Sequence, residues 1–288
     1  MNKRKLISSA LALICAVVMG ACGKQTASPD EQGDNQSGGT TEAIAFLNKA
    51  LDKYESQPGL EMRIHLKSVY PEDPSGIPEA EMGNKSREYV IRAAHANEKE
   101  YQCWHSDTDQ EDRLYIFSKT NDAMLFGHLF DKEMEISSYS NNVHGSDSFN
   151  VLRRDLNGFM PKGEYAAYFD FKMTKDGDHT IVTMYCKDLA GYTKYRREHY
   201  NLFEDNPDAK YTIFEDEYFI DSDFNLIKIN NHLKTDYGKG QVSEINMTTD
   251  IKTISEGIIN TEFLDSLVND MESGKLHEGD SVEWKIDA

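Results

Sequence analysis

The sequence is poor in cysteine, in basic residues and in long apolar runs, and each shortage excludes a class of protein. Four cysteines in 288 residues are too few for a small scaffold held together by several disulfides. Lys and Arg number 31 against 50 Asp and Glu, which argues against nucleic-acid binding, because that needs clustered basic side chains on phosphates. The apolar run from Leu6 to Met19 is about 14 residues long, whereas a membrane-spanning helix needs roughly 20.

Catalytic and metal-binding motifs are also missing. The sequence has no Gly-x-Ser-x-Gly elbow, no His-Glu-x-x-His pair, no Ser-x-x-Lys and no phosphate-binding Gly-x-x-x-x-Gly-Lys. The string Asp221-Ser222-Asp223 starts like a calcium loop, but Leu226 stands where that loop needs Gly and His232 where it needs Glu. We therefore expect neither an enzyme nor a cofactor or metal site.

The N-terminus has the pattern of an export signal. Lys3, Arg4 and Lys5 precede the apolar run, and Gly20-Ala21-Cys22 follows it. This order predicts a signal peptide over residues 1–21, cleavage before Cys22, and lipidation of Cys22 on the extracytoplasmic face of the cell membrane. An ordinary secretory signal with a chance cysteine is the alternative.

Residues 22–41 are expected to form the lipidated cysteine and a flexible tether. This stretch has no aliphatic residue larger than Ala, so it buries too little apolar surface to offset the entropy of ordering. Cleavage removes three basic residues and no acidic one, which takes the formal charge from −19 to −22. Such a charge disfavours adsorption to anionic headgroups. The densest acidic runs, Asp107 to Asp112 and Phe214 to Tyr218, are interpreted as solvated loops and strand faces.

Processing leaves two cysteines that could pair. Cys15 departs with the signal peptide and Cys22 carries lipid, so Cys103 and Cys186 remain. Both lie in apparent strands among apolar neighbours. Export permits a disulfide between them, and two buried thiols are equally reasonable.

The remaining chain alternates helix and strand patterns in the manner of an α+β fold. Residues 43–54 show helical periodicity, with Thr40 or Thr41 as the expected cap, and residues 60–70 change to the period-two alternation of a half-buried strand. Short connectors then join successive strand-like runs, which favours antiparallel hairpins. We predict a curved, mostly antiparallel sheet, an unclosed barrel, covered on one face by a few helices. It spans residues 42–274, with a polar stretch at 141–148 as a candidate seam and residues 275–288 as a C-terminal tail. Strands are expected at 86–96, 99–105, 113–119, 123–130, 133–140, 165–174, 179–187 and 210–220. A hairpin is expected with 227–233 on one arm and 245–251 on the other, joined through 237–240, and further helices are expected at 149–157, 189–203 and 261–273.

This pattern resembles the lipoprotein-carrier-like superfamily of LolA-type unclosed barrels, including exported lipoproteins of Gram-positive bacteria. The similar features are Cys22 with its polar tether, the helix at 43–54 leading into the strand at 60–70, and the alternating hairpin at 219–254. The resemblance implies that the protein carries a hydrophobic ligand.

Two functions are consistent with these observations. The first is a non-enzymatic, membrane-tethered lipoprotein that binds a hydrophobic small molecule or lipid between sheet and helices. The second is an acidic interaction or sensing module of the envelope with a filled core, which binds a protein partner or cations. Aromatic, methionine and isoleucine side chains on the predicted strands are the candidate ligand contacts: Met62, Ile64, Tyr89, Trp104, Phe126, Phe169, Phe171, Ile229 and Met247.

Overall fold

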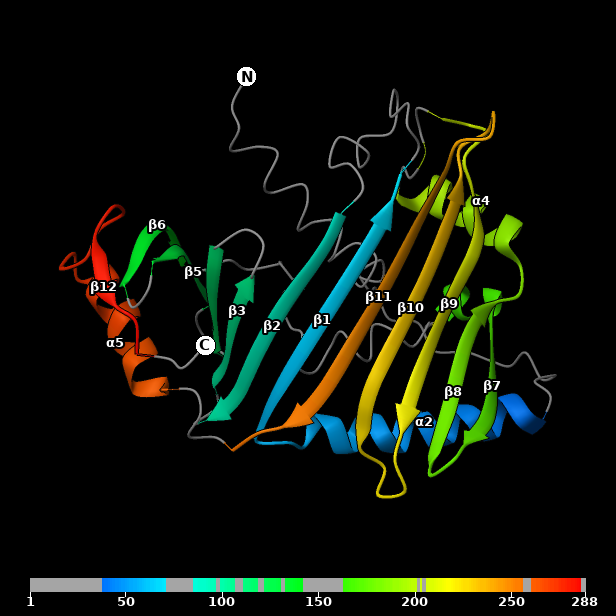
Figure 1. The fold of residues 1–288 in the computed structure, drawn as a ribbon, viewed down its shortest axis with the longest axis horizontal. Helices are drawn as coiled ribbons and strands as arrows, with labels where there is room; N and C mark the ends of the chain where they lie inside the picture. Colours follow the sequence, from blue (N-terminus) through cyan, green and yellow to red (C-terminus); the bar gives the residue numbers. More distant parts are fainter. Residues whose placement is uncertain are drawn as a thin grey trace. The chain divides into compact units, whose positions relative to one another are not determined.

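The structure, a computed structural model, describes the body of the chain without its N-terminal segment. The described residues are 38–70, 85–96, 99–106, 111–118, 122–130, 133–141, 163–200, 203, 206–255 and 260–285. The predicted signal peptide, Cys22 and the helix expected at 149–157 lie outside them. Within the described ranges the chain forms three α-helices, a 3-10 helix and twelve strands in a mostly antiparallel sheet (Figure 1).

The chain divides into two compact units whose segments alternate along the sequence. Unit 1 comprises residues 1–55, 66–86 and 150–248, and unit 2 comprises residues 56–65, 87–149 and 249–288. Strands β1 (Gly59–Val69) and β11 (Val242–Thr253) contribute residues to both. The stretch proposed as a seam, 141–148, lies outside the described residues after Asn141, so it stays a prediction.

Unit 1 is an antiparallel sheet with helices on one face. Its strand order is β1-β11-β10-β9-β8-β7, from β7 (Phe169–Asp176), β8 (His179–Cys186), β9 (Lys210–Ile220) and β10 (Leu226–Asp236). The first helix, α2 (Gly38–Glu55), packs across β7 and β10 (Figure 1). A short η3 (Gly163–Tyr168) and α4 (Leu189–Tyr200) flank β7 and β9.

We call the helix-covered side of this sheet the inner face. Register places Phe171, Met184, Asp216 and Asn231 side by side on four successive strands. Two residues along, Val182, Tyr218 and Ile229 form the next row. Along β11, Ile245 and Met247 are buried, whereas Glu244 and Thr248 bond to His232 and Asn230 on the outer side. The inner face is therefore apolar and aromatic, with one row that carries a carboxylate.

Helix α2 docks through an apolar stripe and through a turn of the sheet. Ala43, Leu47, Ala50 and Leu51 are buried along one side, at the spacing that places residues on one helical face. The turn after β9 presents Phe224, whose ring packs 4.9 Å from the ring of Phe46. These contacts hold a helix from the start of the described chain against a hairpin far along the sequence.

Unit 2 contains the second run of strands and the last helix. Its order is β12-β6-β5-β4-β3-β2-β1-β11, and the five strand pairs from β2 to β12 are antiparallel. The bounds are β2 (Lys85–Ala96), β3 (Lys99–Ser106), β4 (Glu111–Ser118), β5 (Asp122–Phe130), β6 (Glu133–Asn141), α5 (Thr261–Glu272) and β12 (Ser281–Glu283). Met134 and Ile136 of β6 pack with Leu264 and Leu267 of α5 in a local core.

The predicted class is confirmed: the fold is α+β with a mostly antiparallel sheet. Among the described strands the order begins at β12 and ends at β7, so the sheet does not close. None of the helices in the described ranges is long and apolar enough to cross a membrane.

Three local expectations were wrong. Residues 165–168 form the end of η3 rather than a strand, and Lys187 donates its backbone N–H to the Tyr168 carbonyl there. Helix α2 begins at Gly38, so Thr40 is not a cap; its hydroxyl instead donates to the Phe171 carbonyl at 3.2 Å. The C-terminal tail contains β12, which pairs with β6 because Val282 lies opposite the buried Met134.

Candidate functional site

Four of the candidate ligand contacts lie together on the inner face of unit 1. Phe169 and Phe171 come from β7, Ile229 from β10 and Met247 from β11, and all four are buried. Alternation along each strand places them on one side, as the period-two pattern predicts. Because β7 directly contacts α2, this face lies between sheet and helix, where a ligand was expected.

The other five candidates do not belong to this group. Met62 and Ile64 are buried residues of β1 in unit 2. The backbones of Tyr89, Trp104 and Phe126 lie on β2, β3 and β5, with Trp104 opposite Ile91. The side chains of these three residues lie outside the described ones, so their role stays a prediction.

An aromatic cluster joins α4 to the inner face. The Tyr192 ring lies 5.1 Å from Phe169, 5.4 Å from Phe214 and 5.4 Å from Tyr211 between ring centroids. Tyr192 is fully buried, and Arg196 donates to its hydroxyl at 3.2 Å. Edge-to-face and offset arrangements such as these are favourable beyond the apolar area they bury. The cluster therefore fixes α4 over one end of the face.

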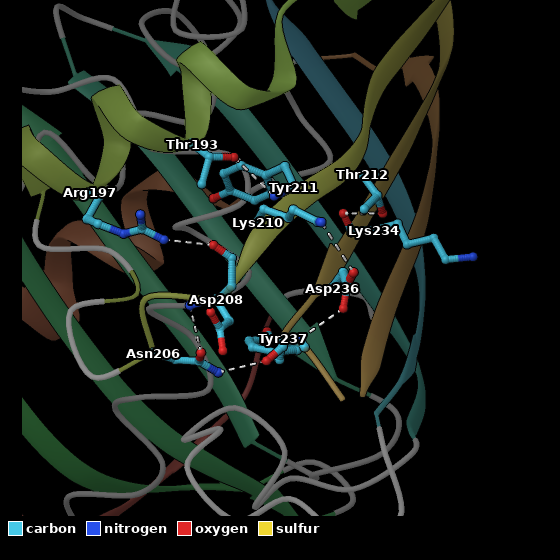
Figure 2. Close-up of polar contacts among 12 residues, drawn as sticks. Thr193, Arg197, Asn206, Asp208, Lys210, Tyr211, Thr212, Lys234, Asp236 and Tyr237 are labelled. Carbon is cyan, nitrogen blue, oxygen red and sulfur yellow. Dashed lines mark hydrogen bonds and ion pairs between the residues drawn. The ribbon is translucent and has the colours of Figure 1, made fainter. Parts of the chain in front are cut away.

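Polar contacts join α4 to β9 and to residues 207–209 before it, and join Asn206 to Tyr237 directly after β10, as Figure 2 shows. The Tyr211 N–H donates to Thr193 Oγ1 at 3.1 Å. Arg197 Nη2 donates to the carbonyls of Ala209 at 2.8 Å and Pro207 at 3.0 Å. Asn206 Nδ2 donates to the Tyr237 carbonyl at 3.1 Å. These side chains satisfy backbone groups next to the strand ends, and those of Thr193 and Arg197 thereby position α4.

A buried polar pair lies in the middle of the inner face. Asp216 and Asn231 are each 6% exposed, and Asn231 Nδ2 donates to Asp216 Oδ1 at 2.7 Å. Burial raises the pKa of Asp216 to about 7; the hydrogen bond from Asn231 lowers it, and the Glu215 carboxylate raises it. The protonated form of this carboxyl therefore persists to a higher pH than it does in an exposed Asp.

Sequence reasoning missed this pair. The run Phe214 to Tyr218 was interpreted as a solvated face, and that was wrong for Asp216. A signal was present, because Asp216 alternates with Phe214 and Tyr218 at the spacing of one strand face. The aromatic residues mark that face as the inner one.

The calcium-like turn at residues 221–225 uses its own carboxylate. Asp221 Oδ1 accepts hydrogen bonds from the backbone N–H of Asp223 at 2.9 Å and of Asn225 at 2.8 Å, and Asp221 Oδ2 accepts from Asn225 Nδ2 at 2.7 Å. This is the local bonding of an Asx turn. Within the described ranges no group of three His, Cys, Asp or Glu side chains could hold a metal ion.

Cys186 is expected to react slowly with thiol reagents. It is a free, buried thiol at the end of β8, and burial raises its pKa from 9.0 to about 11. At pH 8 the folded chain should therefore carry about a hundredfold less thiolate at this position than the unfolded chain. The measurement is the rate with Ellman's reagent in the mature chain carrying Cys22→Ser and Cys103→Ser, native against unfolded; equal rates would contradict it.

Both alternatives for Cys103 and Cys186, a disulfide or two buried thiols, stay predictions. The structure records Cys186 as a thiol, and the side chain of Cys103 lies outside the described ones. Titrating thiols in the unfolded, unreduced chain distinguishes them, because a disulfide leaves neither Cys103 nor Cys186 with a free thiol.

Known proteins with a similar sequence or structure do not identify a family for this chain. No protein-family model and no curated protein matches this chain. Among solved structures, a DUF1329 family protein from Desulfovibrio piger is 9% identical, with a TM-score of 0.28, over 76% of this chain and 96% of that one. A similarity of this size carries no argument about function, and the resemblance to LolA-type carriers stays a prediction.

Proposed function

We propose that the protein is a non-enzymatic lipoprotein, tethered to the extracytoplasmic face of the cell membrane through Cys22, that binds an apolar or amphiphilic ligand on the inner face of unit 1. The signal pattern supports the tether, and the apolar inner face supports ligand binding. A lipid anchor keeps the domain beside the membrane, which is the source of such ligands.

One observation carries the ligand assignment: four side chains chosen from the sequence as ligand contacts share the face beneath α2. Phe169, Phe171, Ile229 and Met247 form that group. Aromatic rings provide large flat contact area, and Met adapts its shape to irregular partners. Small-molecule sites are mostly apolar with a few polar groups that fix orientation, and the inner face has this composition.

Ligand entry requires a helix to move. Phe169, Ile229 and Met247 are covered by protein atoms, so a ligand displaces part of α2 or α4 to reach them. Binding should therefore change the protection of α2 or α4 in amide hydrogen exchange. Titration of a fluorescent acyl probe into the mature chain tests the function, with unfolded chain as control; a probe that stays as mobile as in buffer would oppose it.

In the proposed function, attachment to the membrane depends on lipidation of the Cys22 thiol. In Cys22→Ala we expect loss of palmitate labelling and of membrane association, because no other cysteine follows an apolar run and small residues. A Cys103→Ser chain is the matched control and should label normally. Full labelling of Cys22→Ala would contradict the assignment.

The covered inner face also favours the second candidate, an acidic interaction module with a filled core. After processing the chain has 28 basic and 50 acidic residues, a formal charge of −22. In this second candidate the acidic surface binds a basic protein partner or cations. In that case the acyl probe finds no site, and partner binding weakens at high salt because surface charges are screened.

A further inference from the structure

The polar pair of the inner face is built into an apolar surrounding. Asp216 lies in register between Met184 on β8 and Asn231 on β10. Along β9 its same-face neighbours are Phe214 and Tyr218, and Tyr218 is fully buried. A carboxylate taken out of water in such a place costs free energy unless it is paired. A core that served packing alone would gain by an apolar residue here.

One end of the Asn231 amide is left without a partner. Its Nδ2 donates to Asp216, while Oδ1 is buried and accepts no hydrogen bond within the part of the chain that the structure describes. Turning the amide over does not help, because Nδ2 then becomes the orphan. An unsatisfied buried acceptor is costly. A hydrogen-bond donor placed beside the pair would remove this cost.

The negative charge around the pair disfavours an anionic head group. The neighbouring charged group that acts on Asp216 among the described residues is Glu215, also an acid. An anionic head group placed here would lie beside carboxylates of the same charge and beside acceptor oxygens of Asp216 and Asn231, to which it could donate no hydrogen bond. A hydroxyl or an ammonium group meets acceptors only, and hydrogen bonds to a charged partner are the stronger ones.

We propose that Asp216 and Asn231 hold the polar head of the bound amphiphile, and that this head is a hydrogen-bond donor without negative charge, a hydroxyl or an ammonium group. The proposal rests on the proposed function, since it assigns the head of a ligand whose tail packs against Phe171, Ile229 and Met247. Long-chain amines, alcohols and monoacylglycerols are then ligands, and fatty-acid anions are poor ones.

The test compares three amphiphiles with the same tail: dodecylamine, monolauroylglycerol and laurate. Each is titrated at pH 8 against the mature chain carrying Cys22→Ser, below its micelle concentration, by displacement of an acyl probe. The wild-type chain should bind the amine and the monoacylglycerol about tenfold or more tightly than laurate, the ratio that one good charge-assisted hydrogen bond gives. The Asp216→Asn chain should lose its preference for the amine over laurate. It should still prefer the monoacylglycerol to laurate, because the new amide oxygen accepts a hydrogen bond from the hydroxyl.

A charge-matched variant controls for the acidic surface. Asp178→Asn, in the exposed turn between β7 and β8, removes the same charge and should keep the full preference. Equal binding of all three amphiphiles would overturn the head assignment, and so would a preference for the amine over laurate that is unchanged in Asp216→Asn. In either case the proposed ligand-binding function would stand. No binding of any of the three would overturn the proposed function itself.

Discussion

Tyr192→Ala is expected to destabilise unit 1 by about 3–5 kcal/mol, the cost of removing a large aromatic from a packed core. The residue is fully buried and contacts Phe169, Tyr211 and Phe214 at once. Its loss leaves a cavity between α4 and the inner face that the surrounding strands cannot fill. Urea unfolding followed by near-ultraviolet circular dichroism measures the change.

Tyr192→Phe separates packing from hydrogen bonding. It keeps the ring and removes only the hydroxyl that accepts from Arg196, so we expect a loss of about 1 kcal/mol. Similar losses for both variants would mean that the cluster contributes little and that α4 is held by the Arg197 and Thr193 contacts instead.

Stability is expected to fall as the pH rises from 4 to 8, with Asp216 as a principal cause. Burial raises its pKa from 3.8 to about 7, so the folded chain binds the proton more tightly than the unfolded chain. The stabilisation is complete below about pH 4, falls as the pH rises, and is lost above about pH 7. The shift corresponds to roughly 4 kcal/mol in the free energy of unfolding.

Asp216→Asn isolates this contribution from all other titrating groups. The variant keeps the shape and the acceptor for Asn231 Nδ2, and it cannot ionise. Its free energy of unfolding should match that of the wild type at pH 4 and exceed it at pH 8 by up to about 4 kcal/mol. Parallel pH profiles for the two chains would show that Asp216 is hydrated in solution.

The period-two alternation was the dependable signal for the sheet. It predicted β1 and β9 to within one residue and it found the hairpin of β10 and β11, because one face of each strand is buried and the other is wet. It supplied Phe169, Phe171, Ile229 and Met247 as candidate contacts, and the structure shows that all four are buried on one face. Composition could not reveal which elements cover that face, since the packing of α2 on β7 joins residues that are far apart in sequence.

The misses have physical causes. Val282 is a weak signal by itself, and β12 forms only because it pairs with β6 beside a core that α5 completes. Asp216 was missed because charge was given more weight than position: an acid in an acidic run was assigned to solvent, although its aromatic neighbours at two-residue spacing lay on the buried side. Tertiary context overrides local preference at both places.

Native mass spectrometry of the mature chain carrying Cys22→Ser, purified without detergent from an exporting host, tests directly whether the protein holds an amphiphile. We expect a fraction of the chain to carry one added mass, which is released on unfolding and identified as an amphiphile whose head is a hydroxyl or an amine. A chain that carries no added mass, and takes up none when incubated with monolauroylglycerol, would contradict it.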